Sequence, residues 1–224
     1  MVAAKAPPRP QARSHRSRLR TGLAPSYETH QERAIGPAES VLDVGCGANS
    51  PLGRFGVRYA HTTGVELFPP ALEQARSLGT HDDYLPIDVL ELEDFVQPRS
   101  YDAVVAFDLI EHLTKEDGRR LLATMERIAR DRVVVFTPNG FLEQQPADGN
   151  PLQAHRSGWT APELQLLGYE VVGVHGLRTL RGVRGSMRWR PSRFWGVVSD
   201  LTQPLVHRIP ALAFHLLGIK RVAR

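Results

Sequence analysis

The stretch VLDVGCGAN, residues 41–49, decides the fold of this chain. Its first four residues are apolar apart from one acid and lead into glycine, as in a strand buried in a parallel sheet. Gly45 and Gly47 let the backbone approach a ligand closely, and the start of a following helix presents free N–H groups. A dinucleotide-binding loop needs a third glycine where this chain has Ser50, followed by Pro51. The dinucleotide fingerprint therefore fails.

Short apolar runs alternate with helix-like stretches on the C-terminal side of this motif. We expect strands at residues 40–44, 61–66, 83–88, 101–107, 132–137 and 169–175, and helices at 69–78, 116–129 and 162–167. Near-continuous apolar strands separated by helices indicate a parallel sheet covered on both faces. The sequence therefore predicts an α/β fold.

The rest of the chain divides around this core. We expect residues 1–25 to form a disordered basic tail and residues 26–176 to form the core domain. Residues 177–213 interrupt the alternation with an Arg-studded loop and an apolar, aromatic stretch, which favour a helical insertion serving as a lid or facing a membrane. Residues 214–224 are expected to supply a closing strand and the C-terminus.

Charge is distributed unevenly along the 224 residues. The net charge is +4, but residues 1–27 carry +6 and residues 171–224 carry +9, which leaves −11 on the segment between them. Basic ends on an acidic body suggest an anionic partner, such as a phospholipid surface, a nucleic acid or a phosphorylated substrate. The alternative is that the Arg residues only keep these ends soluble.

Cysteine content and hydropathy bear on the compartment. Cys46 is the single cysteine, so the chain can form no internal disulfide, and a reducing, cytoplasmic setting is expected. The basic N-terminal stretch is not followed by the apolar segment of a secretory signal. No run of 18 apolar residues is present, so an ordinary transmembrane helix is not expected. Localisation at the inner face of the membrane stays open as a peripheral association.

The glycine-rich motif resembles the first motif of the class I S-adenosylmethionine-dependent methyltransferases, in particular their small-molecule type. That motif is a hydrophobic pair, an acid, a hydrophobic residue and Gly-x-Gly-x-Gly. Asn49 stands in place of the third glycine, and asparagine also tolerates a left-handed backbone. The resemblance covers residues 40–140. It implies a Rossmann-like three-layer sheet, mostly parallel with a final antiparallel strand, that binds S-adenosylmethionine and transfers its methyl group.

The resemblance also implies which residues hold the cofactor. Glu66, 21 residues beyond Gly45, matches the acid that accepts the ribose hydroxyls, and Asp88 matches the acid beside the adenine amino group. Asp43 is expected to orient the glycine turn as well. The full expected cofactor set is Asp43, Gly45, Gly47, Glu66, Leu67, Asp88, Val89 and Asp108.

Two histidines are candidates for removing a proton from the acceptor during methyl transfer. His112 lies in the motif DLIEHL, residues 108–113, which follows a predicted strand. His155 lies in a polar loop within residues 137–159, and loops of this length tend to be functional. The alternative for His112 is that it and Glu111 open a helix and serve in capping or packing.

Several acceptor classes are disfavoured. The Asn/Asp-Pro-Pro-aromatic motif of nucleic-acid amino methyltransferases is absent, and Cys46 lies away from the position where cytosine-carbon methylation needs a cysteine. No zinc-ligand spacing appears, so no metal is expected. The predicted acceptor is a small molecule or a lipid- or glycan-linked molecule.

Three further possibilities remain open at this point. The Arg-rich stretch beside Phe194 and Trp195 could meet an anionic membrane. The basic ends could instead bind RNA phosphates in an RNA methyltransferase, although few aromatic residues are available there for base stacking. A catalytically silent binding module of the same fold is the third possibility, and the intact glycine and acid set argues against it.

Overall fold

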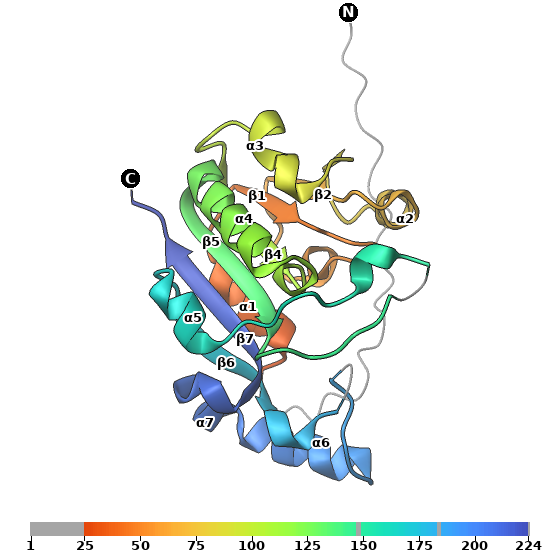
Figure 1. Ribbon diagram of the computed structural model, residues 1–224, viewed down its shortest axis with the longest axis vertical. Coiled ribbons are helices and arrows are strands. Elements are labelled where there is room, and N and C mark those ends of the chain that lie inside the picture. Colours follow the sequence, from red (N-terminus) through yellow and green to blue (C-terminus); the bar gives the residue numbers. More distant parts are fainter. Residues whose placement is uncertain (1–24, 147–148, 183–184, 224) are drawn as a thin grey trace, which may run out of the picture.

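The computed structural model describes residues 25–146, 149–182 and 185–223. Its centre is one seven-stranded sheet in the order β3-β2-β1-β4-β5-β7-β6 (Figure 1). The strands are β1 Ser40–Val44, β2 His61–Val65, β3 Asp83–Leu85, β4 Tyr101–Phe107, β5 Ala129–Pro138, β6 Glu170–Leu177 and β7 Ala213–Arg221. Strands β1 to β5 pair in parallel, and β7 runs antiparallel between β5 and β6. The expected α/β sheet with an antiparallel closing strand is confirmed.

Helices cover both faces of this sheet (Figure 1). They are α1 Tyr27–Ile35, α2 Pro69–Leu78, α3 Leu92–Phe95, α4 Lys115–Ile128, α5 Ala161–Leu166, α6 Ser192–Leu201 and α7 Gln203–Arg208. One buried cluster joins the sheet to Leu92 of α3, Leu121 of α4 and Leu164 of α5. The other joins it to Ile35 of α1. These two clusters confirm the three-layer arrangement.

Most predicted elements are present, with shifted ends. β3 is shorter than expected and ends at Leu85, while β5 is longer and begins at Ala129, directly after α4. Helix α1 was missed in the sequence because its mean hydropathy is low. Its N-terminus is capped by the Ser26 side chain, which accepts a hydrogen bond from the Thr29 N–H.

The predicted helical insertion is present as α6 and α7, together with short 3-10 turns. The expectation that its arginines are all solvated is wrong for Arg181. This guanidinium donates from Nε to the His175 carbonyl (2.6 Å) and from a terminal nitrogen to Ser199 Oγ (3.0 Å). Its burial lowers the pKa of Arg181 to about 10. Arg184, another member of this Arg run, lies outside the described residues.

Asn139, directly after β5, fixes the point where the insertion returns to the sheet. Its Nδ2 donates to the carbonyl oxygens of Pro210, Ala211 and Ala213 at 3.1, 3.0 and 2.9 Å. The Asn139 backbone N–H donates to the Phe214 carbonyl. One buried side chain therefore sets where β7 begins.

The expected disordered tail falls mostly on residues 1–24, which lie outside the described residues. No helix in the described part of the chain is long and apolar enough to cross a membrane.

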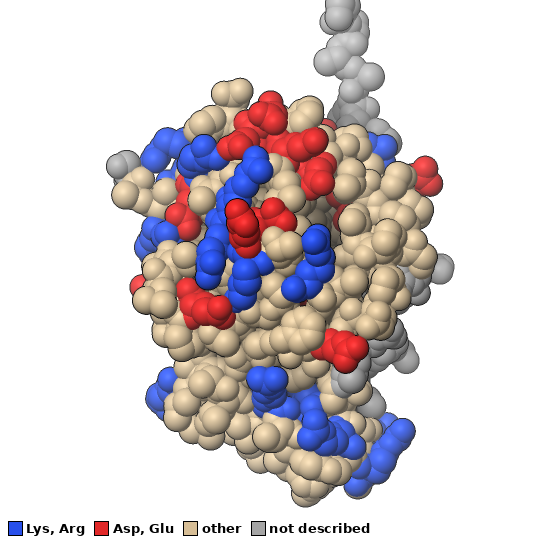
Figure 2. All heavy atoms as spheres, in the orientation of Figure 1, with Lys and Arg blue, Asp and Glu red and all other residues tan. Residues whose placement is uncertain are grey.

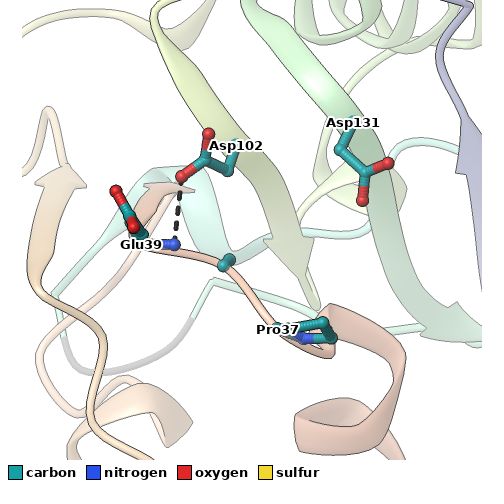
Figure 3. A pocket seen from close by; sticks show the side chains of 5 residues that line it. Pro37, Glu39, Asp102 and Asp131 are labelled. Carbon is teal, nitrogen blue, oxygen red and sulfur yellow. Dashed lines mark hydrogen bonds between the residues drawn. The ribbon is translucent and has the colours of Figure 1, made fainter.

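The N-terminal edge of the sheet carries a structural hydrogen-bond network. Asp102 at the start of β4 accepts hydrogen bonds from the backbone N–H groups of Glu39 (Figure 3) and Ser40. Arg130 pairs with its other oxygen. These partners hold the pKa of Asp102 below its usual value although burial alone would raise it. Pro37, Glu39, Asp102 and Asp131 line a hollow here, at the opposite edge from the glycine loop.

Candidate active site

The glycine loop lies at the C-terminal edge of the sheet, where β1 ends. Gly45 and Gly47 have φ angles of 69° and 58°, in the left-handed region. A Cβ atom on Gly45 would lie 2.6 Å from a methyl carbon of Leu109, so a side chain here would strain the left-handed backbone and displace Leu109. A Cβ on Gly47 would meet no heavy atom within 4 Å. The backbone of Gly47 is therefore open to a ligand.

Glu66 faces this loop from the end of β2. Its two carboxylate oxygens accept hydrogen bonds from the backbone N–H groups of Gly47 (3.0 Å) and Phe68 (2.7 Å). The next residue, Leu67, is 41% exposed. The carboxylate is thus held at the loop by two backbone donors, with an exposed apolar side chain beside it.

Asp43 is buried under the glycine loop. Its Oδ2 accepts a hydrogen bond from Ser50 Oγ (2.5 Å) and lies 3.1 Å from His81 Nε2. Both the Asp43 and His81 side chains are almost fully buried. The expected role of Asp43 in orienting the turn gains support from this contact with Ser50. His81 was missed in the sequence, because no motif marks a histidine that contacts the first strand from a distant turn.

Cys46 is enclosed within the same loop. Its backbone N–H donates to the Val65 carbonyl, and burial raises the pKa of its thiol well above the ordinary value. A thiol that stays protonated is a poor nucleophile. Cys46 therefore serves as a small residue that packs in the turn.

Asp88 and Val89 follow β3 at the same edge. Asp88 caps the 3-10 turn Val89–Glu91 through a hydrogen bond from the Leu90 N–H to its Oδ1 (2.9 Å). Val89 is only 9% exposed and packs in the core. Asp88 is half-buried at the C-terminal edge of the sheet. It follows β3 and Glu66 follows β2, and these two strands are neighbours.

Asp108 follows β4 with a φ of 49°, an uncommon value for a residue other than glycine. Its backbone N–H donates to the Phe136 carbonyl of β5 (2.8 Å), which fixes this conformation. The Asp108 side chain is 55% exposed, and its Oδ1 lies 3.9 Å from His215 Nε2 of β7. Non-glycine residues with a left-handed backbone are concentrated at functional sites, and Asp108 is one of the residues expected in the cofactor site from the sequence.

Glu111 and His112 form part of a 3-10 turn, Ile110–His112, and do not open the next helix. That expectation is wrong, because α4 begins at Lys115, after the cap residue Thr114. Glu111 is 1% exposed, and its Oε2 accepts a hydrogen bond from Thr137 Oγ1 (2.9 Å). Burial, with the charge of Asp108, raises the pKa of Glu111 well above its usual value.

The polar loop before α5 brings His155 to His112. The backbone N–H groups of Arg156 and Ser157 both donate to the Glu111 carbonyl, at 2.8 and 3.0 Å. Trp159, fully buried, donates from its indole Nε1 to the Ile110 carbonyl (3.2 Å). The two imidazole rings consequently meet edge to face, with centroids 4.7 Å apart.

Both of these histidines are neutral at pH 7. Burial, with the neighbouring His155, lowers the pKa of His112 to about 4. Burial also lowers the pKa of His155. Each ring donates its Nδ1–H to a backbone carbonyl, His112 to Ala154 (3.2 Å) and His155 to Leu142 (2.6 Å). The Nε2 atom of each ring therefore keeps its lone pair, as a proton acceptor requires.

A second histidine pair lies on the other side of Asp108 and was missed in the sequence. His175 Nδ1 lies 2.9 Å from His215 Nδ1, and the rings stack with centroids 5.0 Å apart. Tyr27 of α1 packs against His175, and Phe136 against His215. Sequence reasoning could not pair residues from two strands of unknown register.

This pair is expected to make stability depend on pH. Burial lowers the pKa of His215 to about 3 and that of His175 well below its usual value. Below pH 6.5 the two histidines bind protons in the unfolded chain but not in the folded chain. The contribution of the pair to the free energy of unfolding is therefore complete above pH 6.5 and is lost as the pH falls toward 3. Urea unfolding of a His215→Gln variant should show a shallower pH dependence, by about 1.4 kcal/mol per pH unit. An unchanged slope relative to the wild type between pH 6.5 and 4.5 would contradict this assignment.

The segment that contains the glycine loop and the acids after it resembles known proteins. Residues 42–137 match a family model described as a methyltransferase domain. The chain is 30% identical over 109 residues to a ubiquinone biosynthesis O-methyltransferase of Hahella chejuensis, covering 47% of this chain and 44% of that protein. It is 28% identical over 144 residues to the protein of the same name from Idiomarina loihiensis, covering 53% and 58%. The chain thus spans about half the length of the curated relatives it matches.

The fold as a whole also resembles solved structures. One is a SAM-dependent methyltransferase from Archaeoglobus fulgidus, with a TM-score of 0.53 and 15% identity over 87% of this chain and 92% of that one. At this level of identity the likeness concerns the fold alone.

Proposed function

We propose that this chain, whose residues 42–137 match a methyltransferase domain, is a class I methyltransferase that transfers a methyl group from S-adenosylmethionine to an oxygen atom of a small-molecule acceptor. The observation that carries the proposal is the open backbone of Gly47 facing the fixed carboxylate of Glu66. A carboxylate at this place can accept both hydroxyls of a ribose.

The residues at the C-terminal edge fit this cofactor. The left-handed turn at Gly45 and Gly47 leaves room for the ligand beside its backbone, and Asp43 beneath it keeps the turn in shape. Leu67 offers an exposed apolar side chain, and Asp88 a carboxylate near the adenine position that the family resemblance implies. The cofactor supplies an activated methyl group when bound, so the protein mainly aligns the acceptor with it.

The acceptor is proposed to lie next to Asp108, His112 and His155. The O-methyltransferase names of the two relatives favour a hydroxyl acceptor, which must lose its proton as its oxygen takes the methyl group. The free Nε2 of His112 or His155 is available for that proton, which would leave the ring positively charged until solvent takes it up.

A transfer assay with methyl-labelled S-adenosylmethionine tests this function. The purified chain is incubated with a panel of phenols, including lipid-linked ones, and the label is followed into product. Label in an acceptor, lost in the Glu66→Ala variant, would support the proposal. If the wild type does not bind S-adenosylmethionine in calorimetric titration, the proposal fails, and the chain would be a silent module of this fold.

A basic and apolar surface around α6 favours peripheral contact with an anionic membrane. Basic side chains cover the lower end of the molecule over α6, whereas most acidic side chains lie higher, where they alternate with other basic side chains (Figure 2). Exposed members of this surface are Arg188, Trp189, Arg190, Arg193, Phe194, Leu201, Leu205 and Ile209. Arginine with tryptophan beside exposed aliphatic groups is typical of a membrane interface, and a lipid-linked acceptor would then lie near the site.

Reversing two charges on this surface should weaken vesicle binding. We expect the Arg190→Glu, Arg193→Glu double variant to bind phosphatidylserine-containing vesicles at least about tenfold more weakly, since each basic residue contributes about 1 kcal/mol near an anionic surface. Sedimentation with vesicles measures this. A matched double variant at the exposed Arg58 and Arg119 should bind as the wild type does. Equal loss in both would indicate only an overall charge effect. Strong, salt-dependent binding to RNA in place of vesicles would favour the RNA methyltransferase alternative.

A further inference from the structure

We propose that Glu111, His112 and His155 form a binding site for one divalent transition-metal ion beside the acceptor position. Each of these residues offers one ligand atom, and the three atoms lie within 4.8 Å of one another. Two imidazoles and one carboxylate form a set that suits zinc, iron or manganese. The sequence predicted no metal because these ligands come from two separate loops rather than from a compact spacing motif.

An unpartnered buried atom is the first observation that points to a cation. Glu111 is 99% buried, yet its Oε1 has no hydrogen-bond partner, while Oε2 is held by Thr137 Oγ1. A buried carboxylate oxygen without a partner is costly, and a metal ion is one group that satisfies it.

The orientation of the two histidines is the second, independent observation. Backbone carbonyls accept the Nδ1–H of each ring, Ala154 from His112 and Leu142 from His155. This fixes the tautomer and leaves both Nε2 lone pairs unprotonated. Metal-binding histidines are held in the same way, by an acceptor at the other ring nitrogen.

The geometry needs only a small closure to complete the site. Bonds of about 2.0–2.2 Å place the ligands of one zinc ion roughly 3.5 Å apart. The backbone N–H groups of Arg156 and Ser157 donate hydrogen bonds to the Glu111 carbonyl, so the backbone of the loop that carries His155 is already in place. Three protein ligands leave coordination positions for an oxygen of the acceptor, a role that rests on the proposed function. With both Nε2 atoms on the ion, the ion rather than an imidazole would promote loss of the acceptor's proton. Binding of the ion itself does not depend on it.

Metal binding to the full chain, without affinity tag or S-adenosylmethionine, tests the proposal. Mn²⁺ is titrated and followed by the loss of its free electron-spin-resonance signal, with Zn²⁺ added as competitor. We expect one ion per chain. His112→Gln and His155→Gln should each weaken binding at least about tenfold, and Thr137→Val, which removes only the hydrogen bond to Glu111, about tenfold. His61→Gln, at an exposed histidine of β2, should bind as the wild type does.

Two results would overturn the site. One is a wild type that binds neither Mn²⁺ nor Zn²⁺ at millimolar concentration, and the other is a His112→Gln or His155→Gln variant that binds like the wild type. Thermal unfolding of each variant shows whether it is folded, and Thr137→Val serves if the histidine variants are not. Calorimetry with S-adenosylmethionine on the same samples separates the two proposals. Metal binding without cofactor binding would support the metal site and contradict the proposed methyl transfer. Cofactor binding without metal binding would contradict only the metal site.

Discussion

Glu66→Ala is expected to bind S-adenosylmethionine at least about thirtyfold more weakly than the wild type, a loss of about 2 kcal/mol from removing a charged acceptor of hydrogen bonds. Its carboxylate accepts hydrogen bonds from the backbone N–H groups of Gly47 and Phe68. The substitution therefore removes the proposed ribose acceptor and also loosens the loop beneath it. Isothermal titration calorimetry measures the effect directly.

A matched substitution controls for the loss of one acid. Glu73 of α2 is an exposed glutamate close in sequence, and Glu73→Ala should retain the affinity of the wild type. Glu66→Gln keeps one oxygen acceptor and should fall between Glu66→Ala and the wild type. Affinity of Glu66→Ala within threefold of the wild type would remove Glu66 from the cofactor site.

His81→Ala is expected to lower the free energy of unfolding by about 3 kcal/mol, the cost of leaving a buried carboxylate without one of its two hydrogen-bond partners. The His81 and Asp43 side chains are almost fully buried, and the Nε2 to Oδ2 distance is 3.1 Å. Urea unfolding at pH 7 measures the loss. Because Asp43 also holds Ser50 beneath the glycine loop, cofactor affinity should fall as well.

His61→Ala is the control for this second experiment. This histidine belongs to the same region of the sheet, but its side chain is 46% exposed, so the change in stability should stay within about 0.5 kcal/mol. Asp43→Asn combined with His81→Ala should cost less than the sum of the single changes, since the two residues share one interaction. A His81→Ala variant less than about 1 kcal/mol below the wild type would show that the pair contributes little.

The fold, and the edge of the sheet at which Gly45, Glu66 and Asp108 lie, could be predicted because their signals are local in sequence. The apolar runs that became β1 and β4 end at Gly45 and Asp108, and each strand end carries its own chemistry. Parallel pairing then brings these ends to one edge without further information. Glu66 was placed at this edge in the same way, from its position after β2.

The rest depends on contacts between distant segments. The pairing of His175 with His215 requires the register of two antiparallel strands, and their sequences contain no marker for it. The contact between His81 and Asp43 likewise joins a turn to a strand 38 residues away. The alternative that Glu111 and His112 open a helix is wrong, because helix α4 begins later, at Lys115, and Glu111 is buried.

The three hydrogen bonds that the Asn139 side chain donates around the start of β7 affect how this protein can diversify. One amide fixes the place where the chain re-enters the sheet, whatever precedes it. The segment before that point can then lengthen, shorten or change its surface while β7 keeps its register. Relatives with the same sheet but different insertions could thus acquire different docking partners in one step, as long as the asparagine is retained. The amide separates the inherited chemistry of the core from the part of the molecule that is free to evolve.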